Sequence, residues 1–270
     1  MSNNVNPIIT ENVNLFYTKG VYSWFTKSVA KLFSIVNAIL KGIKDPAIIL
    51  DSMKYFKLVS CIWVVNHNAN KLQGISSISS SVCDNLFCKA RQAIKDCICK
   101  FCYAFNQQSY QTGLKEHNIL NGIILRNILI PVEMFKVLPI LFPYLRIESF
   151  GDVANVIQAR NYIRIIKAFP EKRSAIWSKN IAIWEQAFIL EGKPDNCTYV
   201  HSSSELNKPV VIDRNRYWFV DHVFTVYTKQ YAKEHNITIN CGGKKCMVCI
   251  LEKKNCYYRN TEFYINELKK

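Results

Sequence analysis

Four cysteines near the end of the chain have the residue type and spacing of a metal site. Cys241, Cys246, Cys249 and Cys256 form the pattern C-x4-C-x2-C-x6-C, with two glycines after the first cysteine. Two thiolates separated by two residues can hold one ion from a tight turn, and four soft ligands suit a tetrahedral zinc ion. The spacing predicts a structural Zn²⁺ site. Neighbouring lysines are expected to lower the thiol pKa values: Lys244, Lys245, Lys253 and Lys254.

Other ligand sets stay open, because a zinc site of this type usually has two C-x2-C pairs and this chain has one. Cys197 and His201, spaced C-x3-H, are an alternative to the first and last cysteines of the cluster. His235 is an alternative to one of them. Two further readings need no zinc: buried, reduced cysteines that pack as small hydrophobic side chains, or a redox-active Cys246–Cys249 pair.

A second group of five cysteines lies in the middle of the chain, at Cys83, Cys88, Cys97, Cys99 and Cys102. At 100° per residue, Cys88, Cys99 and Cys102 fall on one side of a helix and the other two on the opposite side. One unbroken helix therefore cannot bring all five to one ion, and core packing is favoured. Cys88, Cys99 and Cys102 can supply three ligands to a metal ion if the helix breaks near Lys95 and another segment adds a fourth ligand.

Two patterns of cations are suited to nucleic acid. Arg160, Arg164 and Lys167 recur at helical spacing, which can follow phosphates, although a solvated helix face has the same pattern. Arg214 and Arg216 precede a run of aromatic residues, a composition that can stack unpaired bases or form a hairpin with its aromatic residues inside. Together with Lys244 and Lys245, these residues are the predicted nucleic-acid contacts.

The composition favours polyanionic partners and a reducing compartment. Lys and Arg number 35 against 20 Asp and Glu, a net charge of +15, and the cysteine count of 11 is odd. A surplus of positive charge attracts nucleic acid or an anionic membrane surface. The first residues show no signal-peptide pattern and no apolar run reaches the 18 residues of a membrane span, so we expect an intracellular protein, in cytoplasm or nucleus. The abundance of Asn, Lys and Ile indicates an A/T-rich genome, such as that of a virus.

Residues 21–43 predict an amphipathic helix, with Trp24 and Phe25 on the side opposite several lysines. A helix of this kind packs on its own protein or lies on an anionic membrane. The second case suggests a peripheral membrane or matrix-like assembly protein.

Catalytic motifs are absent from the sequence. It contains no glycine-rich phosphate loop, no G-x-S-x-G and no H-E-x-x-H. None of the five histidines has a carboxylate or histidine partner at a useful spacing. We therefore assign no catalytic residue and favour a binding protein over an enzyme.

The periodicity predicts a mainly α protein in two domains. Helices are expected at 21–43, 46–62, 82–105, 152–169 and 170–190, and a polar loop at 66–81. Gly192 and Pro194 suggest a boundary, giving a helical domain of residues 1–192. Residues 193–270, with a hairpin at 209–220 and a helix at 221–235, form a small α+β, zinc-stabilised module. The leading hypothesis is a non-catalytic, basic, zinc-binding protein with a regulatory or structural role on nucleic acid, from a virus.

Overall fold

The computed structural model of the protein describes residues 52–95, 97–242, 245–253, 256–259 and 261–269. The chain divides into two compact units, residues 1–58 and 59–270. Helix α3 (Ser52–Val59) lies within the predicted helix 46–62. The predicted helix 21–43, with its membrane-facing Trp24 and Phe25, lies outside the described residues.

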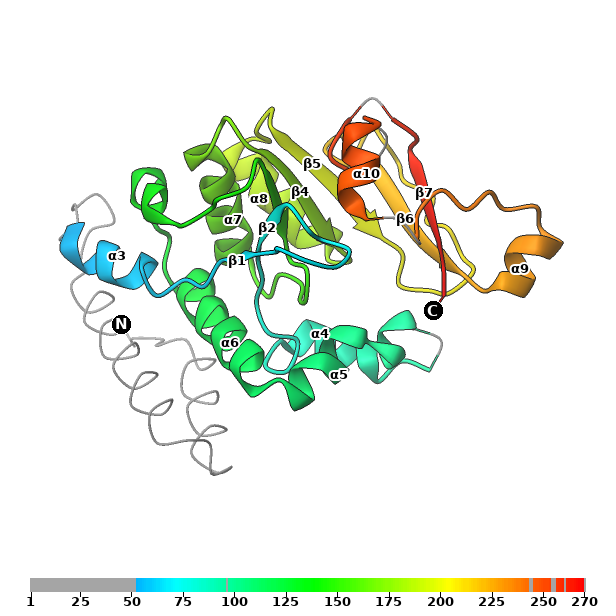
Figure 1. The fold of residues 1–270 in the computed structure, drawn as a ribbon, viewed down its shortest axis with the longest axis horizontal. Helices are drawn as coiled ribbons and strands as arrows, with labels where there is room; N and C mark the ends of the chain where they lie inside the picture. The colour runs from blue at the N-terminus through cyan, green and yellow to red at the C-terminus, as the bar shows by residue number, and fades with distance from the viewer. Residues whose placement is uncertain (1–51, 96, 243–244, 254–255, 260, 270) are drawn as a thin grey trace, which may run out of the picture. The chain divides into compact units, whose positions relative to one another are not determined.

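Seven strands of the second unit form one sheet in the order of the sequence (Figure 1). The strands are β1 (Val65–Asn66), β2 (Ile75–Ile78), β3 (Tyr144–Ile147), β4 (Arg173–Ser178), β5 (Cys197–Ser202), β6 (His222–Tyr227) and β7 (Tyr264–Leu268). The β1–β2 pair is antiparallel, and every later pair is parallel. Each parallel pair requires a connection that returns along the sheet to the amino end of the next strand.

Helices form most of these connections. They are α4 (Leu86–Gln92), η1 (Ile98–Phe101), α5 (Tyr103–Tyr110), α6 (Thr112–Asn127) and η2 (Val132–Val137) between β2 and β3, α7 (Val156–Ala168) before β4, α8 (Ile181–Glu191) before β5, and α9 (Lys229–Glu234) and α10 (Cys246–Leu251) before β7. Figure 1 shows α7 and α8 on one side of the sheet and α10 on the other. Both faces of the sheet are therefore covered, as is usual for parallel strands.

The core on the α7/α8 side is built from aromatic side chains. The buried Trp184 of α8 has its ring 6.4 Å from that of Tyr162 of α7 and 5.9 Å from that of Tyr199 of β5. Helix α7 begins where the Asn155 side chain accepts a hydrogen bond of 2.9 Å from the backbone N–H of Gln158. This cap satisfies one of the N–H groups that have no partner within the first turn of α7.

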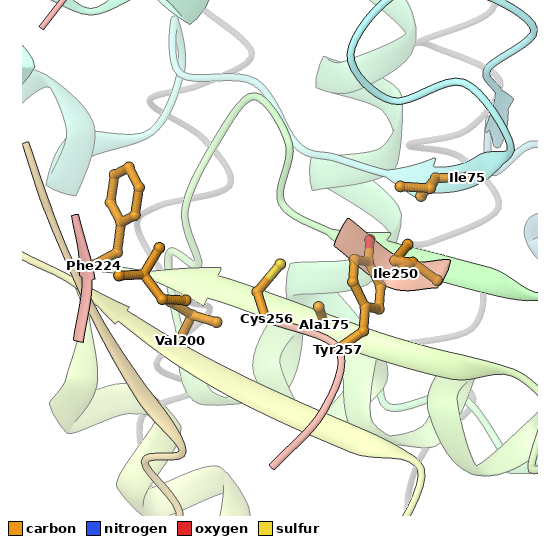
Figure 2. Close-up of a cluster of buried hydrophobic side chains, with 8 residues drawn as sticks. Ile75, Ala175, Val200, Phe224, Ile250, Cys256 and Tyr257 are labelled. Carbon is orange, nitrogen blue, oxygen red and sulfur yellow. The ribbon is translucent and has the colours of Figure 1, made fainter. Parts of the chain in front are cut away.

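The opposite face of the sheet carries a second apolar cluster (Figure 2). Residues of neighbouring strands take part, among them Ala175 of β4 and Val200 of β5, with Ile250 of α10 packed over them. Cys256 and Tyr257, which follow α10, complete this layer. Because successive residues of a strand face opposite sides, Trp177 lies on the same face as Ala175.

The predicted fold class is wrong. The protein is not mainly α but α/β, and residues 193–270 supply β5, β6 and β7 to the same sheet as the earlier strands, so they do not form a separate α+β module. The predicted helix at 170–190 contains β4, and that at 221–235 contains β6, since strands buried on both faces lack the alternation that marks a half-exposed strand. The serine-rich segment 66–81 contains β2, and the predicted hairpin at 209–220 falls in an irregular connection.

Within the described residues, no helix is long and apolar enough to cross a membrane.

Asn161 of α7 links α7 to the end of α6. Its side-chain amide donates to the carbonyl groups of Leu125 and Ile128, at 2.7 and 2.6 Å, and its oxygen accepts from the N–H of Ile130 at 2.9 Å. Asn161→Ala leaves these buried backbone groups without partners, so we expect the free energy of unfolding to fall by about 3 kcal/mol. Urea denaturation measures this, with Asn106→Ala on the exposed side of α5 as the control. Equal stability of the two variants would contradict this role.

Candidate functional site

The carboxyl ends of β2, β3, β4 and β5 gather polar residues at one edge of the sheet. The chain leaves these strands through Ser79–Ser81, Glu148–Asp152, Ser178–Asn180 and Ser202–Ser204. Helices α4 and α5 lie beyond this edge (Figure 1). Parallel sheets bind their ligands at the carboxyl ends of their strands, because backbone N–H groups and loop side chains converge there. This edge is the candidate site.

A buried carboxyl group fixes the loop after β3. Glu148, 3% exposed, accepts hydrogen bonds from the Ser80 hydroxyl at 2.7 Å, the Tyr162 hydroxyl at 2.6 Å and the Gln158 amide at 3.1 Å. Burial raises the pKa of Glu148 to about 7. Its φ of 57° is unusual for a side-chain-bearing residue. A Cβ on Gly151 would lie 2.6 Å from the Glu148 carboxylate, so the loop needs glycine there.

Asp152 ties this loop to β4 and α4. Its carboxylate accepts hydrogen bonds from the backbone N–H groups of Val153 and Lys179, at 2.8 and 2.7 Å, and from the Ser178 hydroxyl. Its carbonyl oxygen accepts from the Asn85 side chain at 2.6 Å, and Asn85 caps the start of α4. Burial raises the pKa of Asp152. The edge of the sheet and the helix beyond it are thus held in one arrangement.

Arg146 of β3 is a cation without an acidic partner. Its guanidinium carbon lies 4.1 Å from the centre of the Trp177 ring of β4, on the face of the sheet that carries α10. In the described part of the chain, Arg146 forms no ion pair, and the buried Nε of Arg146 and Nε1 of Trp177 have no hydrogen-bond acceptor. Two N–H donors therefore lie side by side without an acceptor.

Two more cations lie along the same edge. Lys179 follows Trp177 by two residues and its ammonium group donates to the Ser202 hydroxyl at 3.2 Å. Arg91 of α4 donates to the Ser204 hydroxyl at 2.6 Å. Both cations thus have a neutral oxygen as hydrogen-bond partner.

Four other groups of the edge carry no counter-charge: His201, Cys88, Cys99 and Tyr103. His201 of β5 is buried, and burial together with Lys179 and Arg91 lowers its pKa to about 4, so the ring is neutral. Burial raises the pKa of Cys88, and that of Cys99 to about 12, so both thiols are protonated. The Tyr103 hydroxyl of α5 donates to the Ser149 carbonyl at 2.6 Å while 65% of the residue stays exposed.

The four cysteines of the predicted zinc site lie close enough to influence one another's thiol electrostatics. Cys256, 6% exposed, belongs to the apolar cluster of Figure 2, and Cys241 and Cys246 pack against it. Cys249 is half-buried. Burial raises the pKa of Cys241 to about 11 and of Cys256 to about 12, so the expected lowering by lysines is wrong.

Zinc binding by these cysteines stays a prediction. In the parts of the chain that the structure describes, no three histidine, cysteine or acidic side chains are grouped to hold a metal ion. The alternative zinc ligands, Cys197, His201 and His235, lie apart from one another. Cys197 and His201 lie at opposite ends of β5, about 13 Å apart along a strand, and His235 has its ring 4.0 Å from that of Tyr231.

The central cysteines follow the geometry expected of a broken helix. The predicted helix 82–105 ends at Gln92, and η1 and α5 follow, so the break falls near Lys95. Cys88, Cys99 and Cys102 lie close enough to influence one another's thiol electrostatics. The segment that carries them is tied to the chain after β5 by the bridge between Cys97 and Glu205 and by the hydrogen bond from Ile98 N–H to the Ser204 carbonyl at 2.8 Å. In the described residues these thiols are not grouped to hold a metal ion.

The three cations of α7 that are predicted to contact nucleic acid, Arg160, Arg164 and Lys167, share an acidic partner. Arg160 and Arg164 donate to the Glu191 carboxylate of α8 at 2.8 and 3.0 Å, and Lys167 lies 3.8 Å from it. Lys167 also donates to the Glu191 carbonyl. The three cations therefore hold α7 against α8.

The remaining predicted contacts are dispersed. Arg214 lies over the Phe263 ring at 4.9 Å, and Arg216 pairs with Glu185 at 3.1 Å. Lys245 donates to the Gln73 side chain, and Lys244 lies outside the described residues. Nucleic-acid contact by these residues stays a prediction.

Sequence reasoning missed the residues that define the edge. Arg146 is a single cation in the strand Tyr-Leu-Arg-Ile, and Trp177 and Lys179 fall in a segment that resembles a helix. One signal was present: Glu148, Gly151 and Asp152 directly follow an apolar run, which is typical of a loop at the carboxyl end of a strand.

Comparison of the chain with protein-family models, curated proteins and solved structures gives no match. The geometry of the site is therefore the guide to function.

Glu148 should make stability depend on pH. Its pKa is about 7 in the folded protein against an ordinary 4.5, so its contribution is complete below pH 4.5 and is lost as the pH rises through 7. The difference corresponds to about 3 kcal/mol. Urea unfolding of wild type and Glu148→Gln at pH 5 and pH 8 should show the wild type losing this amount relative to the variant. The exposed Glu171→Gln serves as control, and parallel pH profiles for wild type and Glu148→Gln would refute the assignment.

Packing and zinc ligation make opposite predictions for Cys256. As a buried apolar side chain it should tolerate Cys256→Val, with stability within about 1.5 kcal/mol of the wild type and unchanged metal content. Metal analysis and urea unfolding of the full chain measure both. Bound zinc that is lost together with the fold in Cys256→Val would instead support the zinc site.

Proposed function

We propose that this protein binds a small molecule through an anionic oxygen group, a phosphate or a carboxylate, at the carboxyl edge of its sheet. The main observation behind this proposal is that Arg146 stacks on the Trp177 ring and has no acidic partner in the described residues. The Nε–H group of Arg146 and the Nε1–H group of Trp177, which have no acceptor, are the donors that would bind the oxygen atoms of the anion.

Among the residues that the structure describes, no carboxylate forms an ion pair with Arg146. Burial raises the pKa values of Cys246, Cys256 and Tyr257, so these neighbours are neutral. His67 is neutral as well, because burial and Arg146 lower its pKa. A partly buried cation is stabilised by a counter-charge, and stacking on an aromatic ring contributes only about 1–2 kcal/mol.

One acidic residue of this face, Glu267, has another cation as its partner. Glu267 of β7 accepts a hydrogen bond from the Lys71 ammonium group at 2.8 Å. Arg146 therefore remains available to a ligand. A guanidinium binds carboxylate and phosphate through parallel N–H···O bonds, and the indole N–H of Trp177 adds a third donor.

The other functions predicted from the sequence remain predictions. Nucleic acid also carries phosphate, but binding through Arg160, Arg164 and Lys167 would have to break their contacts with Glu191. An intracellular location and zinc binding are compatible with an anion site. A salt series in filter binding tests the nucleic-acid function separately.

Arg146→Met keeps the apolar stem and removes the charge. We expect binding of inorganic phosphate or acetate, whichever the wild type binds more tightly, to weaken at least about tenfold, because a charge-assisted bidentate contact is lost. Isothermal titration calorimetry at constant ionic strength measures this. The matched control is Arg173→Met, which removes a cation stacked on Tyr258 of the same face, 4.7 Å from its ring, at the other end of β4. A wild type that binds neither anion, or equal affinity in Arg146→Met, would overturn the proposal.

A further inference from the structure

We infer that the ligand of this site carries two anionic groups, of which the second is bound by Lys179 and Arg91; its class is a diphosphate. This inference rests on the proposed anion site at Arg146. The observation behind it is a row of three cations along one edge, each next to a neutral group.

The row is built from contacts at the ends of neighbouring strands. Arg146 lies on Trp177 of β4, and Lys179 directly follows the last residue of that strand. Lys179 reaches the Ser202 hydroxyl on β5, on the same face as Val200. Arg91 reaches the hydroxyl of Ser204, two residues further on, and two residues of chain span at most about 7 Å. Arg146 and Lys179 both act to lower the pKa of the Tyr103 hydroxyl, against the effect of burial, so both cations lie near this group.

The acidic groups near this row have other partners. Asp152 accepts the backbone N–H of Lys179 and the Ser178 hydroxyl, and Glu148 accepts from Ser80, Gln158 and Tyr162. Glu205, which follows Ser204, is paired with Lys208 at 2.9 Å. Over the described ranges, neither Lys179 nor Arg91 forms an ion pair with a carboxylate.

His201 projects from β5 to the face opposite Val200 and Ser202, because successive residues of a strand alternate. Nδ1 of His201 is buried without a hydrogen-bond partner in the described chain, and the residue is 7% exposed. The ring is neutral and lies near both Lys179 and Arg91. The second subsite therefore consists of two cations with hydroxyl partners, which match a phosphate because its oxygens accept several hydrogen bonds at once.

Two linked phosphates neutralise the charge of the three cations more completely than a single phosphate does. A single phosphate satisfies Arg146 and leaves the repulsion between the cations in place, whereas a diphosphate places negative charge along the whole row. Lysine suits phosphate because it acts as a point charge, and arginine because it binds two oxygens.

The test compares inorganic phosphate, pyrophosphate and malonate by isothermal titration calorimetry without divalent cations, at constant ionic strength. The proteins are wild type, Arg146→Met, Lys179→Met and Arg91→Met, with the exposed Lys136→Met in η2 as control. Circular dichroism checks that each variant folds. We expect the wild type to bind pyrophosphate about tenfold more tightly than phosphate. Lys179→Met and Arg91→Met should each lose most of this gain while binding phosphate like the wild type, and Arg146→Met should weaken both anions.

The outcomes separate the inference from the function on which it rests. Phosphate binding that depends on Arg146, without any gain for pyrophosphate, overturns the second subsite and leaves the proposed function standing. Absence of binding by every anion overturns both. A gain for malonate in place of pyrophosphate, lost in Lys179→Met, overturns the diphosphate class. A pyrophosphate gain that survives in both Lys179→Met and Arg91→Met overturns the assignment of the residues.

Discussion

The parallel alignment of β2 to β7 is the constraint on which the rest of this structure depends. Because each strand runs in the same direction as the next, each ends at the same edge, and each connection must return along the sheet. The loops after four strands therefore meet, and their polar groups bond to one another: Glu148 to Ser80, and Asp152 to Ser178 and the backbone of Lys179. These bonds fix the edge without using the cations beside it.

The partners of the cations distinguish those that stabilise the fold from those available to a ligand. Arg160 and Arg164 have the regular spacing of a phosphate-binding stripe, yet both bond to Glu191 and join two helices. Arg146, Lys179 and Arg91 have no regular spacing, yet they meet at one edge beside neutral partners. A net charge of +15 cannot separate these two groups, because it records only the sum.

The sequence predicts elements where local pattern and tertiary packing agree. Helix α7 was expected at 152–169 and lies at Val156–Ala168, since its apolar residues recur at helical spacing after the Asn155 cap. Strands β4 and β6 were missed, because their side chains are buried on both faces. Cys88, Cys99 and Cys102 can come together only if the predicted helix 82–105 breaks near Lys95, and the structure has this break after Gln92. The pairing of Arg146 with Trp177 joins residues of two strands, which no local spacing reveals.

The indole N–H signals of the tryptophans test the central claim most directly. The chain has five tryptophans, and Trp177→Phe identifies the signal of Trp177 in a ¹H–¹⁵N correlation spectrum. The indole N–H of Trp177 is buried beside Arg146 without an acceptor in the described chain, so an anion bound there must move this signal. Titration with pyrophosphate should shift the Trp177 signal in a saturable way, with smaller shifts for the other tryptophans. A Trp177 signal that stays in place while pyrophosphate binds would show that the anion lies elsewhere and would contradict the account.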